Sequence, residues 1–144
     1  MALLRKLLMF IPISFAWVGL KLIDLSIRVR GVRRTYRFLC LTSPSPKRAP
    51  TVSPNGLARV GRIVRKANRR REAYCLRRAL LIWWSLRWLG VSAEIYCDTG
   101  IDKGHAWVEA EGQVVGDRAT LLGTGRFGRF SVLFDQSRSN RPVD

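Results

Sequence analysis

The chain has 144 residues, which suits one compact domain with a buried core. Hydrophobic residues make up 47% of it, which excludes a disordered chain, and its formal net charge of +16 at pH 7 points to anionic partners. The chain has three cysteines, and this odd number argues against a secreted disulfide framework. It has one histidine and no CxxC pair, so we expect no metal site, and we also expect no cofactor.

The positive charge is concentrated in the first half of the chain. Residues 1–72 hold 17 Lys and Arg and 2 Asp and Glu, whereas residues 73–144 hold 9 and 8. The first half is therefore expected to face an acidic protein or peptide, an anionic membrane or nucleic acid. Aromatic side chains that stack on bases are few in this half, which disfavours nucleic acid. The near-neutral second half resembles an enzyme core.

An apolar run lies at the start of the chain. Leu7–Leu20 is 14 uncharged residues behind Arg5 and Lys6, as in the apolar region of a signal peptide. It is short for a membrane span, which needs about 20 residues, and no clean cleavage site follows it. We expect a buried or membrane-surface helix in a cytoplasmic protein, and association with a membrane is left open.

Residues 1–40 are predicted to form one or two helices, broken near Pro12. Apolar residues recur at helical spacing along this region, at Val18, Leu22, Leu25, Val29 and Val32. The stretch Ile23–Arg30 also alternates as a strand would, but the length of the stripe favours a helix. Ser43–Pro54 contains four of the six prolines and is predicted to be a linker. We therefore divide the chain into a basic helical region with its linker, residues 1–54, and a core, residues 55–144.

The core is predicted to contain two helices followed by a small sheet. The first helix carries a stripe at Leu57, Val60 and Val64 and ends within Arg69–Tyr74; the second runs from Cys75 to Leu89, is apolar nearly all round, and stops at Gly90. The expected strands are Ala93–Cys97, His105–Ala110 and Val114–Asp117. The loop Asp98–Gly104 joins the first two strands, and the turn Glu111–Gln113 joins the last two. The glycine-rich stretch Gly123–Phe130 does not fit a nucleotide-binding pattern and is not assigned.

Three side chains of this core suit nucleophilic catalysis. Cys75 heads the buried helix, where the partial positive charge of the helix end favours the thiolate. His105 is the only histidine available as a base, and Asp117 follows it on the next strand, where it can orient the imidazole. The alternatives stay open: Cys75 as a small buried apolar residue, Cys97 or Cys40 as the nucleophile, and Asp98 or Glu109 as the acid.

The segment from Cys75 to Asp117, with "CLRRAL" at its start and "GHAWVE" further on, resembles the leader peptidase of lasso peptide biosynthesis, the protease half of the lasso B protein. That resemblance implies an α+β fold: N-terminal helices plus a transglutaminase-like, papain-related core with the cysteine at the start of a buried helix packed on a small antiparallel sheet. It implies the roles of nucleophile for Cys75, general base for His105 and orienting acid for Asp117. The N-terminal helices match only in length, basicity and their proline-rich spacer.

The resemblance also implies a function and partners. The protein would be a cysteine peptidase that removes the leader of a ribosomally made lasso precursor. A small winged-helix protein would bind the leader, and an asparagine-synthetase-like cyclase would close the ring afterwards. Two alternatives remain: an acyltransferase on the same fold, and a non-catalytic basic module that binds a membrane or nucleic acid.

Overall fold

The computed structural model describes residues 2–44, 52–68, 75–98, 105–117 and 127–129. Within these ranges the elements are α1 (Ala2–Thr42), α2 (Pro54–Ala67), α3 (Cys75–Trp88), β1 (Ala93–Asp98), β2 (Ala106–Ala110), β3 (Gln113–Val115) and β4 (Phe127–Arg129). The four strands form one antiparallel sheet in the order β3-β2-β1-β4. The fold is therefore α+β, as the sequence predicts.

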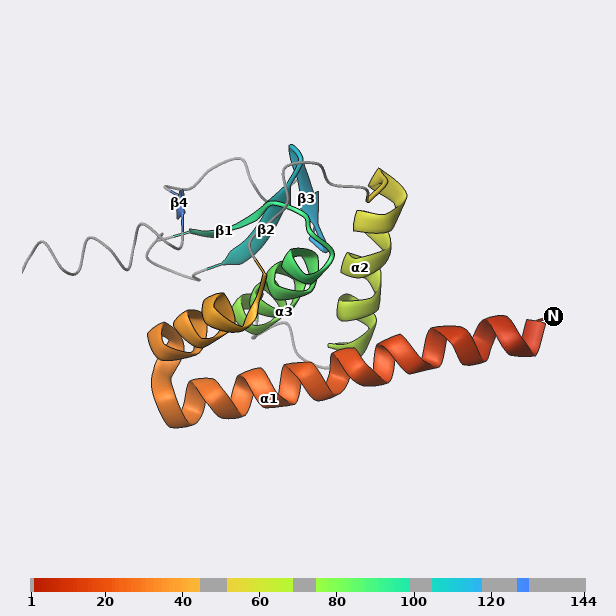
Figure 1. The fold of residues 1–144 in the computed structure, drawn as a ribbon, viewed down its shortest axis with the longest axis horizontal. Helices are drawn as coiled ribbons and strands as arrows, with labels where there is room; N and C mark the ends of the chain where they lie inside the picture. The colour runs from red at the N-terminus through yellow and green to blue at the C-terminus, as the bar shows by residue number, and fades with distance from the viewer. Residues whose placement is uncertain (1, 45–51, 69–74, 99–104, 118–126, 130–144) are drawn as a thin grey trace, which may run out of the picture.

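Helix α3 is the centre of the molecule. It packs against α1 and α2 as well as against β1 and β2, and Figure 1 shows it between α1 and the sheet. Its side chains at Leu80, Ile82 and Leu86 are at most 1% exposed, because a helix that is apolar nearly all round can be covered from every side. The core cluster around it includes residues of α1, α2, β1, β2 and β3. The predicted division of the chain at residue 54 stays a prediction.

Both ends of α3 agree with the sequence. The helix begins at Cys75 and ends before Gly90, which has a positive φ of 78°. Val91 N–H then donates to the carbonyl of Leu86, which closes the helix as glycine-terminated helices commonly do. The indole Nε1 of Trp83 donates to the carbonyl of Ala93 over 2.9 Å, so the end of α3 is bonded to the start of β1.

The predicted break near Pro12 is wrong. Helix α1 continues through Pro12, and its two segments meet instead at Gly31, whose backbone is not helical (φ 78°, ψ 164°). A residue without a Cβ adopts this positive φ without steric cost, whereas a proline removes only one N–H from a helix that packing supports elsewhere. Thr35, 1% exposed, donates to the Gly31 carbonyl and bonds the Ser26 hydroxyl, both over 2.9 Å, and so joins the two segments. Ile23–Arg30 is helical, not a strand.

Two predicted features of the sheet are corrected. The hairpin turn is formed by Glu111 and Gly112, both with positive φ, as tight two-residue hairpin turns require. The third strand ends at Val115, because Gly116 takes a left-handed conformation with φ 79°; it does not continue to Asp117. A fourth strand, β4, which the sequence did not predict, pairs with the end of β1.

Other predicted features lie partly or wholly outside the described residues. These are most of the proline-rich linker, most of the loop Asp98–Gly104, and most of the glycine-rich stretch. Helix α2 has Leu57 and Val64 buried, as predicted, and Ser53 as its N-cap, which accepts a bond from Gly56 N–H. Its predicted end within Arg69–Tyr74 is wrong: the helix ends at Ala67, because Asn68 leaves the helical conformation as the C-cap. Among the described helices, none is long and apolar enough to cross a membrane.

Two glycines bring α2 against the end of β3. A Cβ on Gly61 of α2 would lie 2.5 Å from the backbone N and 2.6 Å from the Cα of Gly116. A Cβ on Gly116 would in turn meet Ile82 Cδ1 at 2.5 Å. Only residues without side chains allow this approach, so the helix–strand contact fixes the backbone immediately before Asp117.

The first prediction tests this contact. We expect Gly61→Ala to be less stable than Gly56→Ala by roughly 1–3 kcal/mol, because an added Cβ at Gly61 meets rigid backbone. At Gly56 the added Cβ meets only the end of the Val52 side chain. Helix propensity works in the opposite direction: the gain is about 1 kcal/mol in a helix interior such as Gly61 and smaller in the first turn, where Gly56 lies, so a lower stability of Gly61→Ala reports the contact. Urea unfolding measures it, and equal stability of the two variants would contradict the close approach.

Candidate active site

Cys75 is the first residue of α3, and its side chain is half-buried. The first four N–H groups of an α-helix have no partner within the helix, and they carry the positive end of its dipole. The position therefore offers backbone donors and a favourable field to an anion formed beside the thiol. This is the placement that the sequence predicts for Cys75.

Cys75 lies near one end of the two central strands, where β1 ends and β2 begins after His105. Its charge is close enough to Cys97 to raise the pKa of that thiol. Cys97 is paired across the strands with Ala106, the residue after His105, and Asp98 N–H donates to the His105 carbonyl over 2.7 Å. The start of α3 and the start of β2 are therefore neighbours.

The imidazole of His105 is held by Asp117. His105 Nε2 and Asp117 Oδ2 are 2.7 Å apart, with the two side chains 28% and 11% exposed. With Nε2–H donating to the carboxylate, Nδ1 is the ring nitrogen that accepts a proton. The contact between these two side chains is the one that the sequence predicts.

The same carboxylate oxygen also accepts a bond from α3. Arg78 Nη2 lies 2.8 Å from Asp117 Oδ2, and the Arg78 side chain is 18% exposed. Arg78 is three residues after Cys75, so the two side chains lie on the same face of the helix, with Cβ atoms about 5–6 Å apart. Asp117 therefore links His105 to Arg78, and Arg78 lies at the same helix end as Cys75.

The left-handed Gly116 aims Asp117 at His105. In the β2–β3 register Val108 is opposite Val115, and continuing it would put residue 117 opposite Ala106. Directly opposed residues share a face of a sheet, so Asp117 would then point to the opposite face from His105. The positive φ of Gly116 interrupts this alternation and allows the carboxylate to reach the imidazole.

A second arginine, Arg77, connects the start of α3 to α1. Arg77 pairs with Asp24 of α1, and these side chains are 14% and 19% exposed. Neighbouring residues on a helix point about 100° apart, so Arg77 and Arg78 reach different partners. Together they hold the first turn of α3 between α1 and the end of β3.

Aromatic rings support the imidazole. The rings of His105 and Trp107 are stacked with centroids 6.0 Å apart, and Trp107 stacks in the same way on Tyr96 of β1. Trp107 Nε1 donates to Glu109 over 2.9 Å, which confirms that residues 105, 107 and 109 share one face. Glu109 is thus engaged by Trp107, while Asp117 is the carboxylate that bonds His105.

The other two thiols lie in environments that favour the protonated form. Burial and, to a smaller extent, the charge of the neighbouring Cys75 raise the pKa of Cys97 to about 11. Burial also raises the pKa of Cys40, a residue of α1, against smaller opposing contributions from Tyr36 and Arg87. Neither thiol is a ready nucleophile near neutral pH, because the thiolate is the reactive form.

The sequence predicts Cys75, His105 and Asp117 as site residues, but it does not predict either arginine. The run "CLRRAL" indicates only that basic residues follow the cysteine. The spacing of Arg78 could have indicated its role, because a residue three positions after a cysteine at the start of a helix lies on the same helix face. The partner of Arg77 had no signal, because Asp24 is distant in the chain.

The second prediction concerns thiol reactivity. We expect iodoacetamide at pH 7.5 to label Cys75 faster than Cys97 or Cys40, since the raised pKa values of the latter two keep them protonated. Labelling of Cys97 should rise only as the pH approaches 11. Mass spectrometry of the alkylated peptides measures all three sites in one sample. Cys97 labelled as fast as Cys75 at pH 7.5 would contradict the assignment.

Comparisons with known proteins agree with this architecture. The Transglutaminase-like superfamily profile matches residues 19–131, from the first segment of α1 to beyond β4. No curated protein and no solved structure gives a significant match to the chain. Since the matched region covers most of the sequence, the chain belongs to the Transglutaminase-like superfamily.

Proposed function

We propose that this protein is a cysteine peptidase that removes the leader from a ribosomally synthesised lasso peptide precursor. The observation that carries a hydrolytic role is the carboxylate of Asp117, which holds His105 Nε2 beside the helix end that begins with Cys75. Membership of the Transglutaminase-like superfamily supports catalysis of the cysteine-peptidase or acyl-transfer type. The lasso precursor as substrate rests on the resemblance of the segment from Cys75 to Asp117.

The first step is attack of Cys75 on the scissile carbonyl. Nδ1 of His105 takes the thiol proton, and the sulfur forms the new bond to carbon. The carbonyl oxygen becomes an oxyanion, which the backbone N–H of Cys75 stabilises at the positive end of α3. His105 then gives its proton to the leaving amine, which is the new N-terminus of the core peptide, and the leader remains as a thioester.

Hydrolysis completes the reaction. His105 takes a proton from water, the hydroxide attacks the thioester, and Cys75 leaves as the thiolate. The products are a leader with a free carboxylate and a core peptide with a free amine. That amine is the group that an asparagine-synthetase-like cyclase would use for ring closure.

Asp117 and Arg78 act through His105. A carboxylate that accepts from Nε2–H selects the tautomer with a basic Nδ1, and it stabilises the imidazolium after proton transfer. Arg78 donates to the same Oδ2, so it fixes the position of the carboxylate. Arg78 is therefore a positioning residue, not a residue that touches substrate.

The partners follow from the resemblance and from the charge. A separate winged-helix protein would bind the leader and deliver it to Cys75. Two arginines on the second segment of α1, Arg34 and Arg37, are exposed, whereas Arg33 is half-buried. The cluster Arg69–Arg71 lies outside the described residues. The exposed pair offers an acidic leader or partner a cationic contact.

Acyl transfer is the second candidate, because the superfamily profile is named for transglutaminases. Both reactions pass through a thioester on Cys75, and they differ in whether water or an amine receives the acyl group. The mass of the released leader separates them. Hydrolysis leaves the free leader acid, whereas transfer leaves an adduct heavier by the amine minus water.

The third prediction tests the nucleophile with a candidate precursor, the leader-binding protein and mass spectrometry. We expect Cys75→Ala to abolish leader release while the fold is kept, because no thiolate remains to form the thioester. Cys97→Ser and Cys40→Ala are the matched controls and should retain cleavage. Cleavage at the wild-type rate by Cys75→Ala would refute the proposal.

The fourth prediction ranks the residues that act with Cys75. We expect His105→Ala to lose about 10²–10⁴-fold in kcat, as is typical for loss of a general base. Asp117→Asn should lose less, because it removes orientation and charge but leaves the base in place.

Arg78→Met should lower kcat with little change in KM, and Arg78→Lys should recover part of the loss. Arg77→Met is its control, since Arg77 pairs with Asp24 and not with Asp117. If Arg77→Met and Arg78→Met lower kcat equally, Arg78 acts only through the stability of α3.

A further inference from the structure

The first segment of α1 exposes a row of large apolar side chains. We call this row the outward stripe; it consists of Phe15, Val18, Leu22, Leu25 and Val29, which are 46–75% exposed. The spacing of three and four residues places them on one face of the helix. The opposite face, with Ala16, Leu20 and Ile23 at most 8% exposed, packs into the core. Helix α1 therefore has two apolar faces, and only one of them is covered.

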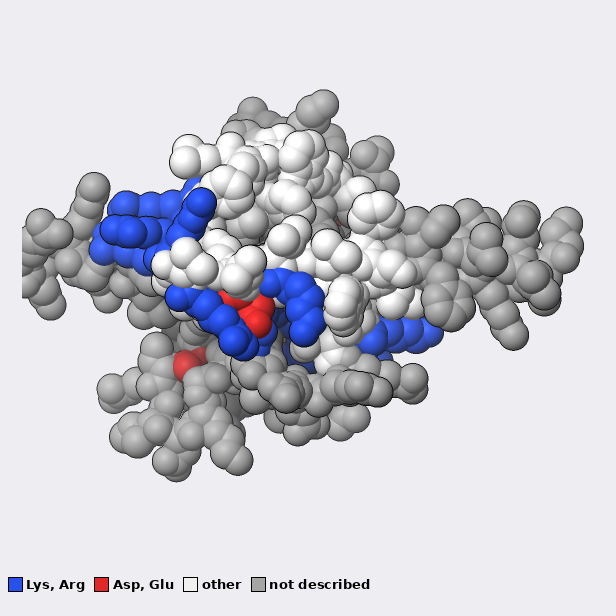
Figure 2. Space-filling view, turned by 90° about the horizontal axis from the view of Figure 1, so that it is seen from below, with Lys and Arg blue, Asp and Glu red and all other residues white. Residues whose placement is uncertain are grey.

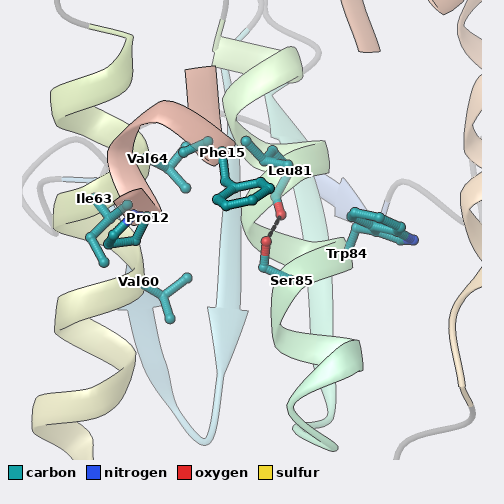
Figure 3. Close-up of a pocket in the computed structure, with 9 residues that line it drawn as sticks. Pro12, Phe15, Val60, Ile63, Val64, Leu81, Trp84 and Ser85 are labelled. Atoms are coloured by element: carbon teal, nitrogen blue, oxygen red, sulfur yellow. Dashed lines mark hydrogen bonds between the residues drawn. The ribbon is translucent and has the colours of Figure 1, made fainter. Parts of the chain in front are cut away.

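The apolar surface continues beyond the stripe. Phe15 also lines an apolar pocket of about 490 Å³ between α1, α2 and α3, and Figure 3 shows its ring between Val64 of α2 and Leu81 of α3. Trp17, next to the stripe, is 52% exposed. A contiguous apolar surface of this kind on a small protein marks a binding surface, because single exposed apolar residues are ordinary but patches are not.

The stripe is bordered by cations. Lys21 and Arg28 lie along one side of it, and the described part of α1 has one acidic residue, Asp24, which pairs with Arg28 and Arg77. Figure 2 views the molecule from the α1 side and shows basic side chains on both sides of a broad surface of other residues. A ligand of the outward stripe should therefore combine an apolar part with negatively charged groups.

Trp17 and Lys21 form a pair suited to a lipid headgroup region. Lys21 Nζ lies over the Trp17 ring, 5.5 Å from its centroid. An indole presents an apolar ring and a polar N–H, so it is stable where hydrocarbon meets water, and a lysine beside it reaches anionic headgroups. Pairing with a second copy is disfavoured, because it would bring Lys21 and Arg28 of one copy against the same cations of the other.

The N-terminal end of α1 extends the same character away from the protein body. Residues 2–11 comprise eight apolar residues and two basic ones, and Figure 1 shows this end of the helix projecting past α2. A partner helix covers one side of such a segment, whereas the boundary between headgroups and acyl chains can accommodate an apolar helix end as a whole.

From these observations we infer that the outward stripe binds the surface of an anionic membrane. Helix α1 lies along the bilayer, with the stripe and Trp17 in the headgroup–acyl boundary and Lys21 and Arg28 at lipid phosphates. The sheet lies on the other side of α3 from α1, so α1 can lie on a bilayer without bringing the sheet against it (Figure 1). This inference is independent of the proposed peptidase activity.

Vesicle flotation of the full chain tests the inference. We expect binding to vesicles of phosphatidylcholine mixed with phosphatidylglycerol, and much weaker binding to phosphatidylcholine alone or at high salt. The double variant Leu22→Gln and Leu25→Gln should bind at least about tenfold more weakly, because it removes two apolar side chains from the bilayer. Lys21→Gln should weaken binding several-fold to the mixed vesicles only.

The matched control replaces two exposed leucines outside the stripe, Leu41→Gln and Leu89→Gln, and should bind as the wild type does. Circular dichroism establishes that both double variants are folded, and Cys75→Ala, which leaves α1 intact, should float like the wild type. Three results would overturn the inference: no flotation with mixed vesicles, equal binding by the two double variants, or a dimer in sedimentation velocity that the stripe variant dissociates while vesicles bind neither protein. The last result would assign the stripe to a second copy.

Discussion

One carboxylate oxygen connects the two halves of the candidate site. Oδ2 of Asp117 is 2.7 Å from His105 Nε2 and 2.8 Å from Arg78 Nη2, and the side chain is only 11% exposed. A carboxylate so poorly hydrated needs charged partners, because burying it alone is costly. Its two partners come from the start of β2 and the first turn of α3, so satisfying Asp117 brings these two elements together. The bonds of Asp117 therefore fix the position of the His105 imidazole relative to the helix end that carries the Cys75 thiol.

That carboxylate depends in turn on two residues without side chains. Gly116 turns the chain out of the strand alternation that would aim residue 117 away from His105, and Gly61 lets α2 approach the turn to backbone contact. Helix α2 carries no candidate catalytic side chain. It contributes by holding the backbone that precedes Asp117, so it bears on the geometry of the candidate site.

Helix α3 separates two surfaces with different tasks. Arg78 faces the candidate site through Asp117, and Arg77 faces α1 through Asp24. The candidate active site thus lies on the sheet side of α3, while the outward stripe and its cations are on the far side of α1. The uneven charge of the chain has a structural counterpart here. Arg77 and Arg78 near the site pair with carboxylates, whereas Lys21, Arg28, Arg30, Arg34 and Arg37 of α1 are exposed.

The sequence by itself determined the elements and the chemical groups. The apolar run of α3 with Gly90 at its end, the alternation of β1 and β2 and a turn that begins at Glu111 are local patterns, and local backbone preferences decide them. Cys75, His105 and Asp117 were identified because they are scarce groups at informative spacings. The Pro12 prediction failed because packing supports a helix through a proline, whereas a buried Thr35 stabilises the reversal at Gly31.

Only the tertiary structure decided which groups meet and which faces are covered. The pairing of Arg78 with Asp117 joins residues 39 positions apart, and β4 exists because the end of β1 offers it a partner. The stripe of α1 showed helical spacing in the sequence, but spacing is the same for a buried and an exposed face. Burial depends on what packs against a helix, and contacts between distant segments arise only when the chain folds.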